Sequence, residues 1–67
     1  MTLTLKEWRG LKGYTLKQVG EMIGVTNQTI ANWESGESEP RISDIPKLRK
    51  AFGLKKGDYI RLGDSLI

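Results

Sequence analysis

The chain has 67 residues, a formal net charge of +3 and a pI near 9.5, and it contains neither cysteine nor histidine. This length fits a single domain over residues 1–67 and leaves little room for an active-site cleft. The missing residue types exclude disulfides, thiol chemistry and the usual zinc-ligand sets, so we expect no metal, cofactor or small-molecule substrate. The basic charge favours a polyanionic partner without proving one.

Nothing in the sequence predicts contact with a membrane. No run approaches the roughly 20 apolar residues that cross a bilayer. The chain also lacks a basic segment followed by an apolar stretch and a cleavage site, which would indicate secretion. We therefore expect a cytoplasmic protein, in a bacterial cell or a phage-infected host, that has no membrane partner.

Residues 1–13 predict the first helix. Thr4 and Glu7 have the spacing of a capping box, in which each side chain binds the backbone N–H of the other residue. Gly13 is a natural stop, whereas Gly10 inside the helix costs about 1 kcal/mol relative to alanine and predicts either close packing or early fraying. The apolar residues on one face are Leu5, Trp8 and Leu11.

A second helix is predicted to begin after Thr15. Its hydroxyl can accept a hydrogen bond from a free N–H of the first turn, and Gln18 can answer it. Gly24 ends this helix, because glycine adopts a left-handed backbone without a steric penalty. The inner, apolar face carries Val19 and Ile23, with Met22 beside them.

A third helix follows, capped by Thr26, and its outer face is the informative part of the chain. Ile30 and Trp33 lie three residues apart and face inward. The outer face is uncharged and rich in amides, and Asn or Gln can pair bidentately with the N6 and N7 edge of adenine, while a methyl group can touch thymine. The candidate base-reading residues are Asn27, Gln28, Thr29, Ala31 and Asn32. Each of them taken singly is better explained as an ordinary exposed residue.

Residues 35–42 read as a loop from their Gly, Ser and Pro content. The fourth helix is predicted to begin at Ser43, because Pro46 then occupies the first turn, where no backbone donor is needed. Its core positions are Ile45, Leu48 and Phe52, with Ala51 beside them and Gly53 as the stop.

The last segment predicts a short helix over residues 56–61. Residues 63–67 are expected to be a frayed, flexible tail, in which Leu66 and Ile67 could close a dimer edge. With no internal repeat and no long linker, the expected architecture is a compact all-α bundle of about five helices.

Residues 15–34, with Gly36 and Pro40 after them, closely resemble the helix-turn-helix of the lambda-repressor-like, Cro/C1-type (XRE family) transcriptional regulators. The shared pattern is a cap, an apolar pair, a Gly-Val turn, a polar outer face, Ile-x-x-Trp-Glu, and then glycine and proline at fixed offsets. The resemblance implies sequence-specific binding of double-stranded DNA, with the helix Thr26–Ser35 in the major groove. It further implies a phage or mobile-element repressor that binds an inverted repeat as a homodimer, since two-fold symmetry places two recognition helices about 34 Å apart.

Other side chains are expected to position the protein rather than read bases. Phosphate contacts fix the register of a protein on the duplex, and the candidates here are Thr15, Lys17, Thr26, Arg41 and Lys12. In the family, an arginine at the position of Arg9 pairs with the glutamate that ends the recognition helix. The resemblance therefore implies a structural ion pair between Arg9 and Glu34.

Four positions depart from the family pattern. Leu16 stands where relatives often have a glutamine that braces the recognition helix, so we expect that contact to be missing. Glu37 and Glu39 lie in a loop where relatives often carry basic residues, and their charge opposes phosphate unless the side chains turn away. Gly20 replaces a common alanine, which permits a close helix crossing.

Other function classes remain open from the sequence. The same fold could dock a partner protein through its polar face, as an antitoxin-like or adaptor module, and the acidic loop favours this slightly. An enzyme is less expected, because no nucleophile, acid/base couple or metal site is evident. RNA binding is less expected still, since single-strand readers display exposed aromatic residues and both tryptophans fit the core.

Overall fold

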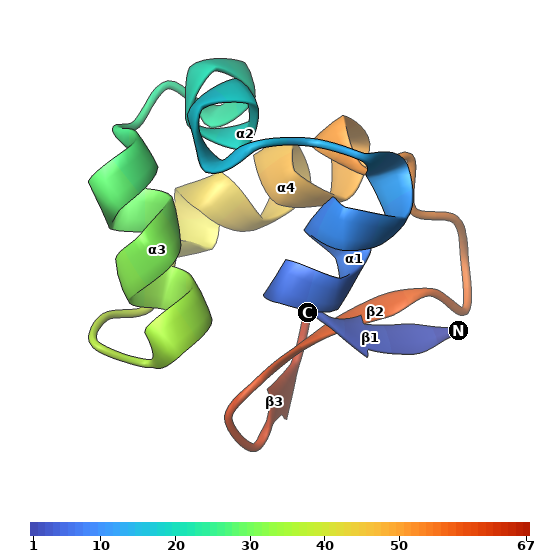
Figure 1. The fold of residues 1–67 in the computed structure, drawn as a ribbon. Coiled ribbons are helices and arrows are strands. Elements are labelled where there is room, and N and C mark those ends of the chain that lie inside the picture. The colour runs from blue at the N-terminus through green and yellow to red at the C-terminus, as the bar shows by residue number, and fades with distance from the viewer.

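The computed structural model describes residues 1–67, and Figure 1 shows four α-helices around one core, with three short strands at one end of the molecule. The elements in chain order are β1 (Thr2–Thr4), α1 (Leu5–Lys12), α2 (Leu16–Ile23), α3 (Asn27–Ser35), the 3-10 turn η1 (Ile42–Asp44), α4 (Ile45–Ala51), β2 (Tyr59–Leu62) and β3 (Ser65–Leu66). None of the helices has the length and apolar character that crossing a bilayer requires.

The predicted five-helix, all-α bundle is wrong at both ends of the chain. Residues 59–62 form β2 rather than a helix, and β2 is the central strand of a three-stranded sheet. Strand β1 runs parallel to it, with Leu3 opposite Ile60. The first helix is shorter than the predicted residues 1–13, because residues 2–4 belong to β1. Strands this short carry no readable periodicity, so their pairing leaves no local signal in the sequence.

Residues 63–67 are not the frayed tail that we expected. Strand β3 pairs antiparallel with β2. Ile60 and Ile67 then exchange both backbone hydrogen bonds, at 2.7 and 2.9 Å. The side chain of Arg49 on α4 also holds this segment, because its Nη1 donates to the carbonyl oxygens of Asp58 at 2.7 Å and Ile67 at 3.3 Å. The C-terminal segment is therefore part of the fold.

The caps and stops predicted for the first three helices agree with the structure, whereas the predicted start of the fourth helix does not. Thr4 and Glu7 form a reciprocal capping box on α1, and Thr15 and Gln18 form one on α2. The glycines that follow α1, α2 and α3 are all left-handed, which ends each helix cleanly. Helix α4 begins at Ile45, two residues after the predicted start at Ser43, which lies in η1. Pro46 lies in the first turn of α4, as predicted.

Nine side chains form the core: Leu5, Trp8, Val19, Ile23, Ile30, Trp33, Leu48, Phe52 and Ile60. Two predicted members are wrong, since Leu11 is 59% exposed and Met22 is 43% exposed. Each lies at the edge of the apolar face of its helix, and that buried face is narrower than the helical spacing of apolar residues predicted. Close packing at Gly10, one of the two predicted alternatives, is absent. No atom lies within 4 Å of a Cβ built there, and α1 continues past it to Lys12.

Candidate nucleic-acid interface

The turn between α2 and α3 is fixed by a close backbone contact. The N–H groups of Gly24 and Val25 both donate to the carbonyl oxygen of Gly20, at 2.8 and 2.9 Å. A Cβ on Gly20 would lie 2.7 Å from the carbonyl oxygen of Val25, so only glycine fits this position without movement of the backbone. The departure from the family alanine therefore has a structural basis, since this contact sets how α3 leaves α2.

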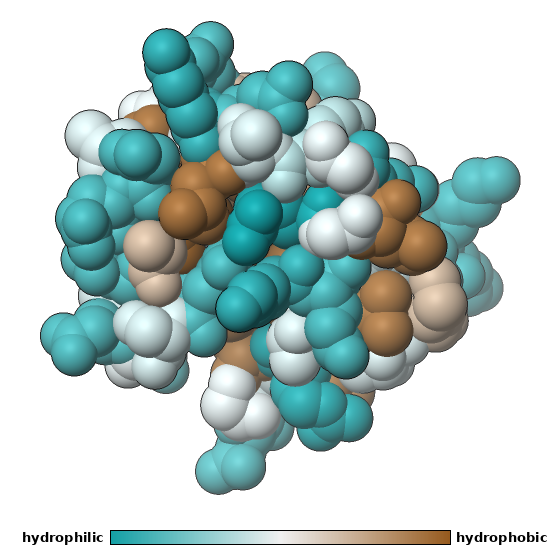
Figure 2. Space-filling model, viewed as in Figure 1, coloured by the Kyte–Doolittle hydropathy of each residue, from teal (hydrophilic) through white to brown (hydrophobic).

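Helix α3 turns its amide side chains away from the core. Ile30 and Trp33 are buried, whereas Asn27 and Gln28 are exposed and Asn32 is half-buried. The α3 side of the molecule is mostly hydrophilic in Figure 2, in the view of Figure 1. Four of the five candidate base-reading residues share this outer face, because helical spacing places positions 27 and 31, and 28 and 32, one turn apart.

Two of these amides are joined to each other. Gln28 Nε2 donates to Asn32 Oδ1 at 2.9 Å, from one turn to the next. Thr29 is turned differently: it is half-buried, and its hydroxyl lies 3.0 Å from the hydroxyl of Thr26. With the hydroxyl engaged at the cap, the methyl group of Thr29 is the part left for an apolar contact.

The N-termini of α2 and α3 carry the candidate phosphate contacts. Thr15 caps α2 by accepting from Gln18 N–H at 3.0 Å, and Thr26 caps α3 by accepting from Thr29 N–H at 3.1 Å. The N–H groups of the first two residues of each helix have no acceptor within the helix. Lys17 is exposed in the first turn of α2. Each helix thus presents donors suited to an anion.

Arg41 lies just before η1, where an acidic residue holds it. Its Nε donates to Asp44 Oδ2 at 3.2 Å, and its backbone N–H donates to the same oxygen at 3.0 Å. The Asp44 side chain is 1% exposed, and burial opposes its ionisation. The side-chain and backbone hydrogen bonds from Arg41 outweigh this effect and lower the pKa of Asp44 below its usual value. Sequence reasoning missed Asp44, although an acid three residues after a turn start is a capping signal.

Arg9 and Glu34 join the end of α1 to the end of α3. Arg9 Nε donates to Glu34 Oε2 at 2.7 Å, and Nη2 donates to Oε1 at 3.2 Å, which makes the pair bidentate. The side chains are only 18% and 9% exposed. The hydrogen bond to Glu34 raises the pKa of Arg9 above its usual value. Arg9 Nη1 also donates to the carbonyl oxygen of Tyr14 at 3.1 Å. One guanidinium therefore contacts both the connection between α1 and α2 and the end of α3.

The remaining positions singled out from the sequence do not join the α3 face. Lys12 Nζ lies 6.0 Å from the ring centroid of Trp8, over its own helix. Leu16 is half-buried and packs against the core, so it offers no polar brace to α3. Glu37 and Glu39 are exposed in the loop after α3, and neither forms an ion pair. No group of three or more acidic residues is placed to hold a metal ion.

Comparisons with known proteins agree on one family. A helix-turn-helix family profile matches residues 5–60. The uncharacterized HTH-type transcriptional regulator YgzD of Bacillus subtilis is 41% identical over 58 residues, which cover 87% of this chain and 88% of YgzD. The SPbeta prophage-derived uncharacterized HTH-type transcriptional regulator YonR of the same bacterium is 32% identical over 59 residues, which cover 88% of this chain and 54% of YonR.

The family match also reaches beyond the bacteria. An uncharacterized HTH-type transcriptional regulator of Methanocaldococcus jannaschii is 35% identical over 54 residues, which cover 81% of this chain and 82% of that protein. With the profile matching all but the two ends, the chain belongs to the XRE-like helix-turn-helix family of transcriptional regulators.

Proposed function

We propose that this protein regulates transcription by sequence-specific binding of double-stranded DNA in the cytoplasm, with α3 in the major groove. The observation that carries the proposal is the outward, uncharged amide face of α3. Amides suit base edges, whereas an ordinary solvent-exposed helix face in a basic protein usually carries charges. Gly20 and the Arg9–Glu34 pair hold the two ends of this helix, so the face is presented in one orientation.

The contacts divide into two classes in this proposal. The base-reading residues are Asn27, Gln28, Ala31 and Asn32 on the outer face of α3, with Thr29 beside them through its methyl group. The phosphate contacts come from the N-termini of α2 and α3, through Thr15, Lys17 and Thr26, and from Arg41, whose exposed guanidinium is held by Asp44. Lys12 contributes a more distant, electrostatic contact.

We also propose that the protein acts as a Cro/C1-type repressor of phage or mobile-element origin. The support is the prophage derivation stated in the name of YonR, which belongs to that relative. A second copy of the chain would let two α3 helices read an inverted repeat, because one small domain reads too few base pairs by itself.

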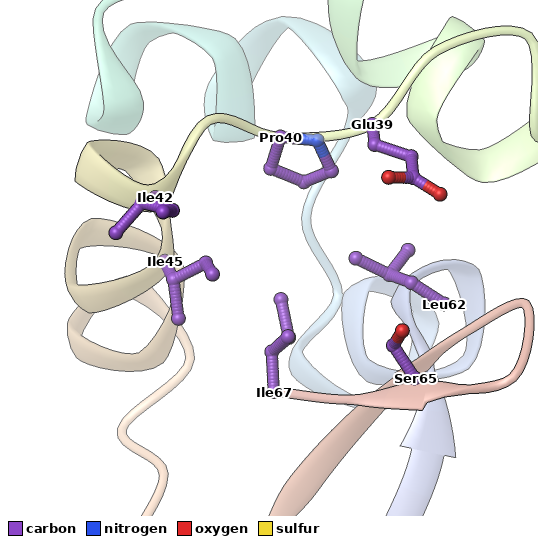
Figure 3. Close-up of a pocket in the computed structure, with 7 residues that line it drawn as sticks. All are labelled: Glu39, Pro40, Ile42, Ile45, Leu62, Ser65 and Ile67. Atoms are coloured by element: carbon purple, nitrogen blue, oxygen red, sulfur yellow. The ribbon is translucent and has the colours of Figure 1, made fainter.

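An apolar hollow between the start of α4 and β3 supports the homodimer. Figure 3 shows Pro40, Ile45, Leu62 and Ile67 around it, drawn from the loop, α4 and the sheet. At its rim Ile42 is 87% exposed. Exposed apolar groups beside an open strand edge suit a second copy of the chain. Ile42→Asp should shift a dimer toward monomer in sedimentation equilibrium, whereas Leu11→Asp, at an exposed position on α1, should not. Equal masses for all three proteins would remove the support for this surface.

Selection from random duplex DNA tests the main proposal. The wild-type protein should enrich an inverted repeat, and Gln28→Ala should relax the preference at one symmetric position by about 1–3 kcal/mol. The same selection at two salt concentrations separates base reading from phosphate attraction. Weak, strongly salt-dependent binding without a motif would overturn sequence-specific binding. That result would favour the alternative function, a protein-interaction module that contacts its partner through the acidic loop of Glu37 and Glu39.

A further inference from the structure

The hydrogen bond between Gln28 and Asn32 changes what each amide can offer to DNA. A glutamine amide has two N–H donors and one oxygen acceptor. One N–H of Gln28 is given to Asn32 Oδ1 at 2.9 Å. The other N–H and the Oε1 oxygen remain free, and Gln28 is exposed on the outer face of α3. One donor and one acceptor on a single planar amide remain to be matched by a ligand.

We propose that Gln28 and Asn32 form one adenine-reading unit, in which Gln28 contacts the base and Asn32 holds Gln28 in place. The free N–H of Gln28 donates to adenine N7, and its Oε1 accepts from the adenine N6 amino group. Asn32 is then a positioning residue and not an independent base reader. The inference rests on the proposed DNA-binding function and refines it to one A·T base pair for the two side chains.

The positions of the two residues explain why Gln28 contacts the base and Asn32 positions Gln28. Asn32 is half-buried, so its side chain is the more restricted, whereas Gln28 is exposed and reaches further out. A free glutamine has three rotatable side-chain bonds and loses that freedom when it is fixed on a base. A hydrogen bond already made within the helix removes part of this cost before DNA arrives, which is the advantage of preorganisation.

Three other candidate side chains of the helix-turn-helix do not supply the brace. Leu16 near the start of α2 is apolar and packs against the core. The Thr29 hydroxyl is engaged with Thr26 at the helix cap. Asn27 is exposed and makes no side-chain hydrogen bond to another residue. Asn27 is therefore the matched control: an amide on the same face that lies outside the pair.

The test is a double-mutant cycle read out by base preference. Wild type, Gln28→Ala, Asn32→Ala and the double variant are selected on random duplex DNA, and their affinities for the enriched site and its single-base variants are measured. Gln28→Ala and Asn32→Ala should both lower discrimination at the same base pair, by about tenfold for Gln28. The double variant should lose no more than Gln28→Ala alone, while Asn27→Ala should leave that base pair unchanged.

Two further variants separate bracing from bulk. Asn32→Asp keeps an acceptor for Gln28 and should retain the adenine preference at lower overall affinity, whereas Asn32→Leu removes the acceptor at similar size and should lose it. Gln28→Glu presents only acceptors and should move the preference from adenine toward cytosine, whose N4 amino group donates. Circular dichroism of each variant checks that α3 remains folded.

Failure of the Gln28–Asn32 unit and failure of the proposed DNA-binding function give different results. If wild type enriches no motif, the proposed function fails. If a motif appears but Gln28 and Asn32 affect different base pairs with additive losses, DNA reading stands and the paired unit is overturned. Retention of the adenine preference by Asn32→Leu would also overturn it.

Discussion

The helix-turn-helix and the three-stranded sheet are stabilised by contacts of different range. Within residues 15–36, the caps, the glycine turn and the helix spacing are all set by neighbours three to five positions away. The sheet instead joins the two ends of the chain: Thr2 lies opposite Tyr59, and Trp8 Nε1 donates to the carbonyl oxygen of Tyr59 at 2.9 Å. One region can form from local signals, and the other needs the rest of the fold first.

The helix-turn-helix and the sheet have different roles in the molecule. The helix-turn-helix presents the candidate DNA face, and no strand takes part in it. The sheet covers one end of the core by bringing Ile60 against the helices. If this view is correct, changes in the sheet should alter stability while they leave base preference unchanged.

The largest expected effect comes from emptying a buried position in each region. Ile30 on α3 and Ile60 on β2 are both fully buried. Replacing either by alanine should cost about 4 kcal/mol, since a buried Ile→Ala change loses about 2–5 kcal/mol. Chemical denaturation followed by tryptophan fluorescence measures the loss, and Ile→Val at both sites covers the case in which the alanine variants do not fold. A cost below about 1 kcal/mol for Ile60→Ala would mean that the sheet is not part of the cooperative core.

Breaking the ion pair between the helices should have the next largest effect. Glu34→Leu leaves the Arg9 guanidinium largely buried without its carboxylate, and Arg9→Met does the converse. We expect each to cost about 3 kcal/mol, the lower end for a broken buried pair. The double variant should recover part of the loss, because it strands no charge. Additive losses in the same denaturation assay would show that the two side chains are not coupled.

Two glycines provide a smaller and sharper test of the helix-turn-helix. Gly20→Ala should destabilise by about 2 kcal/mol, because the new Cβ meets the Val25 carbonyl oxygen and forces a backbone shift. Gly10→Ala has open space around it and should stabilise by about 0.5–1 kcal/mol through helix propensity. The two thermal melts should therefore move in opposite directions. Stabilisation by Gly20→Ala would show that the turn is looser than this contact indicates.

The same difference in range explains what the sequence could predict. The caps at Thr4, Thr15 and Thr26 were readable because a cap needs only residues three positions away. Most of the core was readable from helical spacing. The strands were not, because pairing between residues 2–4 and 59–61 leaves no periodic pattern in either segment.

The candidate site was predictable only in part. The outer face of α3 followed from spacing, and the resemblance supplied the Arg9–Glu34 contact that the structure contains. The local partner of Arg41 was overlooked, although Asp44 lies three residues away. Arg49 could not have been recognised, since the carbonyl groups that it contacts on Asp58 and Ile67 come together only in the folded sheet.

The smallest expected effect is a pH dependence confined to the sheet. Asp58 lies beside the start of β2, and Oδ1 accepts from the Met1 ammonium at 3.0 Å. This hydrogen bond, with one from the Lys55 N–H, lowers the pKa of Asp58 below its ordinary value of 3.8. The folded state therefore binds this proton less readily than the unfolded state. Its stabilising effect is complete above the ordinary pKa and is lost as the pH falls through the lower, folded pKa.

Asp58→Asn should remove this part of the acid sensitivity. The melting temperatures of wild type and variant should differ most above pH 5 and converge as the pH falls through the lowered, folded pKa of Asp58. Asp64→Asn, at an exposed position in the β2–β3 turn with no ion pair, is the matched control and should follow wild type. Since the contact joins the two chain ends, base preference should not change in either variant. A difference between wild type and Asp58→Asn that does not vary with pH would show that the amide alters packing rather than this charge contact.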